Sequence, residues 1–468
     1  MIKKESNKKA LVKGTVLYAI GNLGTKIISF LIVPLYTYYI STGDMGDYDI
    51  LMSTVSLLTP LITLRVSDAA YRWMLHSSDN NKNCISATYR VLAFSSLTAL
   101  VVTILIGDFV ALPYYGYFIS LLILGRWLES LQTLLRGLQK QGLFAASGIL
   151  YTLIYLIYNF WQIVIMHHGI EAMMQGTLIS DIITIALIIT VTPELRVRII
   201  RTKDNRKLTA EMLKYSAPLV PSALSWWVMG ASDRYIIRFI LGRDATGIYA
   251  VANKFPTIIS TLFTIFNLSW TDVAIGKLNE GKETVDYSSR IFKQLYELSF
   301  GFTLALIPLT KIVTNYILAD SYKSASVYIG FLYLGAIFQG FTAFISAGIL
   351  QGTKTNTIAV SSTFGAIANA VVDLALMNTI GIHAASISTF IGFFVMWLIR
   401  MHDAKKISPV NVHKVHFSVY LVASIIMATA SIWTTTVADM ALTIIFGVLF
   451  LVSNRKLISS LIKRISHR

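Results

Sequence analysis

Positively charged side chains stand inside several of the most apolar stretches of this chain. Of its 40 Lys and Arg residues, eight fall within or near segments long enough to cross a bilayer: Lys26, Arg65, Arg72, Arg126, Arg234, Arg238, Lys254 and Lys311. A charged residue at the centre of a membrane helix costs roughly 2.5–3.5 kcal/mol to insert, so each is by default a candidate functional residue. Arg binds phosphate through paired hydrogen bonds and Lys binds it as a point charge. The chemistry that these residues favour is the binding of an anion.

Some of these cations have a simpler explanation. Arg65 and Asp68 lie one helical turn apart, as do Arg126 and Glu129, so a local ion pair is a competing interpretation of both. Three others stand near helix ends, where a long side chain can extend to the membrane surface. These three are Arg72, Arg238 and Lys311.

Five cations remain candidates for contact with an anionic substrate: Lys26, Arg65, Arg126, Arg234 and Lys254. The positions of Lys26 and Arg126 correspond to the middle of the membrane and that of Arg65 to its cytoplasmic half. Arg234 and Lys254 fall toward the outer half. Cations at successive depths would offer a phosphate group partners along a path through the protein.

Two acidic residues inside apolar segments have no obvious cation nearby. Asp181 lies mid-helix, and Asp373 has Asn369 one turn before it. Intramembrane carboxylates are candidate sites for H⁺ or Na⁺, so both are candidates for coupling transport to an ion gradient. The sequence contains no metal-ligand spacing, nucleophile motif or phosphate-cradling Gly-rich loop, and we expect neither an enzyme nor a bound cofactor.

The composition places the chain in a membrane. Its 468 residues are 55% hydrophobic and only 14% charged, whereas soluble domains carry about 25% charged residues. The formal net charge of +16 would by itself suit nucleic acid, but most cations flank apolar stretches and no basic patch is interleaved with exposed aromatic residues. We therefore expect the membrane to be a partner of this chain and nucleic acid not to be one.

Apolar segments recur along the whole chain. A transmembrane helix needs about 20 mainly apolar residues, which gives about fourteen helices here. The predicted spans are 14–40, 48–75, 87–106, 113–136, 142–166, 171–193, 215–241, 245–275, 292–316, 325–350, 357–379, 382–400, 417–436 and 439–453. When these spans are threaded alternately, most Lys and Arg residues fall at the two termini and in the even-numbered loops, which the positive-inside rule makes cytoplasmic. The sequence predicts an all-α, multi-pass integral membrane protein with both termini in the cytoplasm.

The two halves of the chain carry a similar hairpin. The first contains Tyr39-Ile40, Asp44 and Gly46-Asp47-Tyr48, and the second contains Phe239-Ile240, Asp244 and Gly247-Ile248-Tyr249. Both hairpins start from the cytoplasmic side, so the repeat is parallel. We predict six-helix lobes at 1–207 and 208–410 around a central cationic cavity, followed by an extra helix pair and a basic tail at 411–468.

The same hairpins carry a family resemblance. The pattern comprises Phe30-Leu31-Ile32-Val33-Pro34-Leu35, Asp233-Arg234-Tyr235, Phe239-Ile240-Leu241-Gly242 and Gly247-Ile248-Tyr249-Ala250-Val251-Ala252-Asn253-Lys254. It resembles the Wzx-type O-antigen and capsule-repeat flippases of the multidrug/oligosaccharidyl-lipid/polysaccharide exporter superfamily. The resemblance in pattern extends over nearly the whole chain.

The resemblance implies a function. Such flippases move undecaprenyl-pyrophosphate-linked oligosaccharide from the inner to the outer leaflet of the bacterial cytoplasmic membrane, by alternating access driven by an ion gradient of Na⁺ or H⁺. Their partners would include a polysaccharide polymerase and a chain-length regulator. Arg234 and Lys254 match cationic positions of the family motif, so phosphate contact is carried over to them. Lys26, Arg65 and Arg126 rest on the argument from buried charge alone.

Competing interpretations remain at this stage. A lipid II flippase moves the same kind of lipid pyrophosphate. A multidrug exporter shares the fold, but a pore for cationic drugs should be lined by acids. A membrane polysaccharide polymerase would require a large outer loop for its catalytic residues, and the predicted outer loops are short.

Overall fold

Helices make up the architecture of this protein. The computed structural model describes residues 30, 32–76, 80–107, 113–199, 202–277, 282–351, 355–405 and 410–455, and within these ranges it contains no β-strand. The chain divides into two compact units, and the division falls between Arg234 and Tyr235. The lobe boundaries predicted at 207/208 and 410/411 stay a prediction. Each unit is described separately below.

The first unit is built from α-helices joined by short connections. They are α2 (Val33–Tyr39), α3 (Thr42–Thr63), α4 (Val66–His76), α5 (Asn81–Ile106), α6 (Tyr115–Gly137), α7 (Gln141–Asn159), α8 (Glu171–Val191), α9 (Lys203–Ser216) and the start of α10 (Leu219–Ile240). A π-helical turn, Phe160–Ile165, continues α7, and a 3₁₀ turn, Pro193–Leu195, follows α8. Helix α8 packs against both α6 and α7, and α6 packs in turn on α4. The α6–α7–α8 group surrounds the polar cavity described below.

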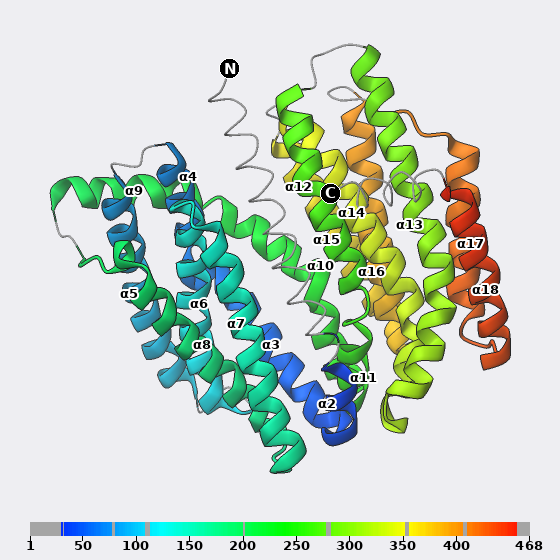
Figure 1. The fold of residues 1–468 in the computed structure, drawn as a ribbon, viewed down its shortest axis with the longest axis horizontal. Helices are drawn as coiled ribbons and strands as arrows, with labels where there is room; N and C mark the ends of the chain where they lie inside the picture. The colour runs from blue at the N-terminus through cyan, green and yellow to red at the C-terminus, as the bar shows by residue number, and fades with distance from the viewer. Residues whose placement is uncertain are drawn as a thin grey trace. The chain divides into compact units, whose positions relative to one another are not determined.

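The boundary predicted between the two lobes, 207/208, falls inside a helix, α9 (Lys203–Ser216). Helix α9 lies across the end of α4 and the start of α5 (Figure 1). Arg90 of α5 holds it there by donating hydrogen bonds to Asn205 (2.7 Å) and Thr209 (3.3 Å), and the Asn205 amide donates to the Asn83 carbonyl (3.0 Å). The linker is therefore tied to the first unit.

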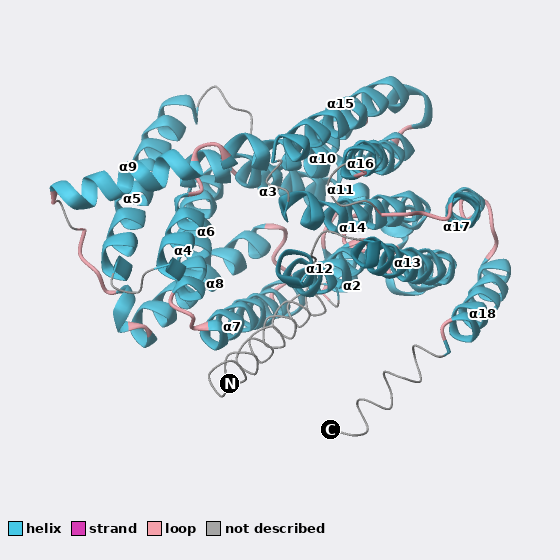
Figure 2. Ribbon diagram, turned by 90° about the horizontal axis from the view of Figure 1, so that it is seen from above, coloured by secondary structure: helices cyan, strands magenta, loops and turns pink. Residues whose placement is uncertain are grey.

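The second unit has one helix enclosed by the others. Its elements are the end of α10, α11 (Arg243–Ala252), α12 (Thr257–Lys277), α13 (Lys282–Ile317), a 3₁₀ segment (Asp320–Tyr328), α14 (Ile329–Gln351), α15 (Thr355–Ile380), α16 (Ile382–Ala404), α17 (Lys414–Ala430) and α18 (Thr436–Ser453). Helix α14 packs against α12, α16 and α17, and its Phe338, Phe341 and Phe344 are buried. Figure 2 shows α13 between α14 and the α17–α18 pair.

The predicted membrane fold is confirmed. In the part of the chain that the structure describes, nine helices are long and apolar enough to cross a membrane, and two bent helix pairs raise this number to eleven. These spans follow the predicted ones closely. Most of the first predicted span, 14–40, lies outside the described residues, α10 carries three charged residues, and α17 is shorter than the others. The prediction of about fourteen helices is compatible with this arrangement.

Both bent pairs fall in the second span of a predicted half. Helices α3 and α4 meet at 55°, where Leu64 and Arg65 adopt left-handed φ angles of 46° and 53°. Such angles are uncommon for residues with a Cβ atom. Helices α11 and α12 meet at 43°, just where Pro256 removes a backbone donor from the helical ladder. The two bent spans therefore occupy the same position in the two predicted halves, but positive φ angles break the first and a proline breaks the second.

A buried ion pair fastens the C-terminal helix pair to α13. The Lys311 ammonium donates to the carbonyls of Ser431 (2.6 Å) and Thr434 (2.7 Å) and lies 3.6 Å from an Asp439 carboxylate oxygen. Asp439 is fully buried and Lys311 is 9% exposed. The expectation that Lys311 extends to the membrane surface is wrong, because the turn between α17 and α18 surrounds its ammonium group with oxygen atoms.

Removing one member of this pair should weaken the attachment of α17 and α18. Asp439→Ala leaves a buried ammonium without its carboxylate, and breaking a buried pair in this way costs roughly 3–5 kcal/mol. We expect a clear loss of thermal stability in detergent, measured by fluorescence-detected size-exclusion chromatography after heating. Asp320→Ala is the matched control, because its pair with Lys323 is exposed and should change stability little. Equal melting of both variants would contradict this account.

Candidate functional site

A polar cavity of about 310 Å³ lies inside the first unit. Its hydrogen-bonding walls come from three helices: Arg126, Glu129 and Gln132 of α6, Tyr151 and Thr152 of α7, and Asp181 of α8. Arg126 stands at the midpoint of α6 and Asp181 at the midpoint of α8. The structure therefore brings together one predicted anion-binding residue and one predicted ion-coupling residue, each near the midpoint of its helix.

Arg126 is only partly satisfied by its neighbours. Its guanidinium lies 3.2 Å from the Glu129 carboxylate and donates a hydrogen bond to the Thr59 hydroxyl of α3. Its Nε–H group is buried and has no hydrogen-bond partner among the described residues. The local ion pair that the sequence left open is present, and the guanidinium keeps a donor for another acceptor.

Asp181 is the least compensated group in this cavity. Its residue is 2% exposed, and the outer surface of its carboxylate lies against Gly125, where an added Cβ atom would stand 3.7 Å from Oδ2. No hydrogen bond or ion pair reaches this carboxylate from the described residues, and its Oδ2 is buried without a partner. A small residue on α6 thus makes room for a carboxylate that has no direct partner and that Arg126 influences only across the cavity.

Arg234 lies in an ion-pair network on α10. Its guanidinium is 2.7 Å from Asp49 of α3 and 3.5 Å from Asp233, and it donates to the Gly230 carbonyl at 2.5 Å. The neighbouring Trp227 indole also fastens α10 to α3 by donating to the Ser53 carbonyl at 3.0 Å. Asp49 is distant from Arg234 along the chain, so the sequence carries no signal for this ion pair.

The remaining cations occupy helix breaks or lie outside the described residues. Arg65 stands at the bend between α3 and α4, where it pairs with Asp68 at 2.8 Å. Lys254 is exposed and lies in the bend between α11 and α12. Lys26 lies outside the described residues. Among the described anion-binding candidates, only Arg126 lines the polar cavity of the first unit.

Asp373 belongs to the core of the second unit. It is fully buried on α15, and Asn369, one turn earlier, is 1% exposed and donates to the Ser388 hydroxyl of α16 at 3.3 Å. Asp373 and Asn369, which were predicted to lie one turn apart on the same helix, are therefore both buried, and Asn369 contacts α16. Asp181 belongs to the first unit and Asp373 to the second.

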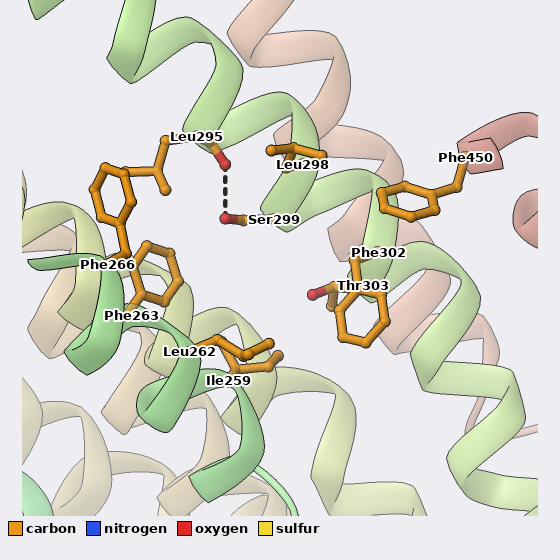
Figure 3. A pocket seen from close by; sticks show the side chains of 10 residues that line it. All are labelled: Ile259, Leu262, Phe263, Phe266, Leu295, Leu298, Ser299, Phe302, Thr303 and Phe450. Carbon is orange, nitrogen blue, oxygen red and sulfur yellow. Dashed lines mark hydrogen bonds between the residues drawn. The ribbon is translucent and has the colours of Figure 1, made fainter. Parts of the chain in front are cut away.

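The second unit has a larger cavity of a different kind. Its volume is about 510 Å³, and its walls come from α12, α13 and α18. Figure 3 shows aromatic rings around this space, with Phe263 and Phe266 on one side and Phe302 and Phe450 on the other. Ser299 and Thr303 are its polar lining residues, and the Ser299 hydroxyl is turned back to the Leu295 carbonyl at 2.7 Å. This cavity is apolar and contains none of the predicted site residues.

Comparison with known sequences identifies the family. Residues 11–270 match the family model described as "Polysaccharide biosynthesis protein", which is more than half of the chain. The chain belongs to this family. An uncharacterized membrane protein of Methanocaldococcus jannaschii is 22% identical over 441 residues, which cover 86% of this chain and 85% of the relative.

Solved structures with the same fold are membrane transporters. The chain superposes on the lipid II flippase MurJ, in an inward closed conformation, with a TM-score of 0.71 at 12% identity, covering 96% of this chain and 100% of that one. It superposes on an inward-facing multidrug MATE transporter of the MOP superfamily with a TM-score of 0.63 at 14% identity, covering 86% and 99%. The predicted family and fold are confirmed.

One buried cation, Arg400, was not among the residues predicted from the sequence. The predicted span 382–400 places Arg400 at the cytoplasmic membrane edge, but the residue is 1% exposed. Its guanidinium donates to three hydroxyls and two carbonyls of α14 and α15, those of Ser361, Ser346, Ser362, Thr342 and Ile358. These five bonds account for all five of its N–H donors, so Arg400 connects three helices and has no donor left for a substrate.

Arg400→Lys tests this structural role. Lysine has three donors at one point and cannot reach the five acceptors, so two or more hydrogen bonds are lost, each worth roughly 1 kcal/mol. We expect a lower thermal stability in detergent, while the control His402→Ala, an exposed position on the same helix, leaves it unchanged. A wild-type melting temperature for Arg400→Lys would mean that the five bonds do not hold α14, α15 and α16 together.

Proposed function

We propose that this protein is a flippase that moves undecaprenyl-pyrophosphate-linked oligosaccharide repeat units from the inner to the outer leaflet of a bacterial cytoplasmic membrane. Both termini would lie in the cytoplasm. The product would be delivered to a polymerase and a chain-length regulator that act at the outer face.

One observation carries this proposal. The family belongs to polysaccharide biosynthesis, while the fold is shared with transporters. A function that satisfies both is transport of a polysaccharide precursor. Such precursors combine a polar glycan with a lipid pyrophosphate, and the protein combines a polar, Arg-lined cavity with an apolar one.

The cations offer partners for the pyrophosphate. Arg126 keeps a donor in the cavity of the first unit, and Lys254 is exposed where a membrane span is broken. Broken spans are where transporters commonly place substrate-binding groups. Arg234 is oriented by Asp49, and together with Lys26 and Arg65 it completes the proposed set.

The bends supply a physical route to alternating access. Helix pairs that meet at a break can change their angle by rotating a few backbone dihedrals, which is how hinges absorb domain motion. Because one bend lies in each half, either half can change shape without unfolding a continuous helix. Exposure of the substrate to one leaflet and then to the other would follow from these changes.

Lys254→Ala provides the test of substrate contact. Loss of one charge-assisted contact to phosphate, worth roughly 1.5–3 kcal/mol, should slow flipping of a fluorescent lipid-pyrophosphate oligosaccharide in liposomes by at least about tenfold. Lys254→Arg should retain much of the rate, and Lys207→Ala on the exposed face of α9 should retain all of it. Equal rates in wild type and Lys254→Ala would exclude phosphate contact at this residue, and a lipid II substrate tested in parallel distinguishes the two kinds of flippase.

Asp373 is the proposed coupling residue of the second unit. Asp373→Asn removes the charge that would bind H⁺ or Na⁺ but preserves the shape of the buried side chain. We expect liposome flipping by this variant to become independent of an imposed ion gradient, while slow equilibration without a gradient continues. A variant that still responds fully to the gradient would remove Asp373 from the coupling mechanism.

A further inference from the structure

The buried carboxylate of Asp181 receives no direct hydrogen bond or ion pair from the described residues. An ionised carboxylate without hydrogen bonds or an ion pair costs several kcal/mol in a protein interior. Asp181 nevertheless lines a polar cavity at the middle of its helix. A proton on this carboxylate, or a metal ion beside it, would supply the compensation that no direct contact from the described residues supplies.

The charges around Asp181 favour a proton over a metal ion. The titratable or charged groups that face it are Tyr48 of α3, Arg126 and Glu129 of α6, and Tyr151 of α7. A fixed guanidinium in the same cavity repels a second cation. Within the described ranges, no group of three or more His, Cys, Asp or Glu residues is arranged to hold a metal. A proton neutralises the carboxylate without adding a second cationic centre.

We propose that Asp181 is a proton-binding site and that its carboxylate competes with that of Glu129 for the guanidinium of Arg126. With a proton on Asp181, the carboxyl group is neutral and Arg126 stays with Glu129 and Thr59. When the proton leaves to water in the cavity, the new carboxylate attracts Arg126, whose Nε–H is unused in the first arrangement. This inference deepens the proposed flippase function, on which it rests, by naming the coupling ion and its exchange partner in the first unit.

The exchange has a mechanical consequence for α3. Arg126 holds the Thr59 hydroxyl, and Thr59 lies only a turn or so before the left-handed residues Leu64 and Arg65 at which α3 bends into α4. Movement of the guanidinium toward α8 releases this hydrogen bond. Protonation of a carboxylate on α8 is thereby linked to the attachment of α3 beside its bend.

Infrared spectroscopy of the purified protein in liposomes tests the proposal without requiring transport. A protonated buried carboxyl group has a C=O stretching band distinct from that of carboxylates. We expect the wild-type protein to show this band at neutral pH and to lose it as pH rises. Asp181→Asn should lack this component, while the matched variant Asp373→Asn should keep it.

Two further variants test the competition by the direction of the shift. Glu129→Gln frees Arg126 to pair with ionised Asp181, so the band should disappear at lower pH than in wild type. Arg126→Gln removes the cation, so the band should persist to higher pH. Each midpoint should move by roughly one pH unit or more, a tenfold change in proton affinity. These readouts also separate a specific role of Asp181 from misfolding, because both variants retain Asp181.

Three outcomes would overturn the proton site. They are an unchanged band in Asp181→Asn, midpoints that do not move in Glu129→Gln and Arg126→Gln, and loss of the wild-type band on adding Na⁺ at constant pH. The same samples also distinguish failure of the proton-site proposal from failure of the proposed flippase function. A band that behaves as expected in a protein that moves no lipid-linked oligosaccharide would contradict the proposed function while leaving the proton site in place.

Discussion

Compensation of buried charge is the constraint on which the rest of this structure depends. A bilayer interior offers no water to an unpaired ion, so each buried charge must find its partner within the protein. The described residues meet this requirement in several ways. Arg400 uses only hydroxyl and carbonyl oxygens, Lys311 combines carbonyls with a carboxylate, and Arg234 is placed between two carboxylates. The partners that each cation already has limit the hydrogen-bond donors that it can offer to a substrate.

The same constraint explains why the polar cavity of the first unit stands out. Arg126 and Asp181 lie on neighbouring helices around one space but are not directly bonded to each other. If Arg126 and Asp181 served only to hold α6 against α8, we would expect a direct ion pair between the guanidinium and the carboxylate. A guanidinium with an unused donor and a carboxylate without a partner are better suited to groups that change partners during a cycle.

Much of the fold could be predicted because membrane insertion imposes simple rules. Helix length and hydrophobicity located the spans, and the midpoint positions of Arg126 and Asp181 could be read directly from those spans. The bends within the spans and the tertiary partners of the charged side chains could not be predicted in this way. The break at Arg65 depends on positive φ angles that no residue type there demands, and Asp49 meets Arg234 only because α3 packs against α10. Arg400 was missed because a cation at a predicted helix end looks interfacial until neighbouring helices are seen to enclose it.

The ion pair between Lys311 and Asp439 has a consequence for how the protein is made. Lys311 enters the membrane with α13, while its carboxylate partner is still untranslated and follows only with α18. Until then, the second unit contains a cation whose compensation is incomplete. Docking of α17 and α18 therefore completes the compensation of Lys311, and a chain that stops before Thr436 would leave its ammonium group without the Asp439 carboxylate.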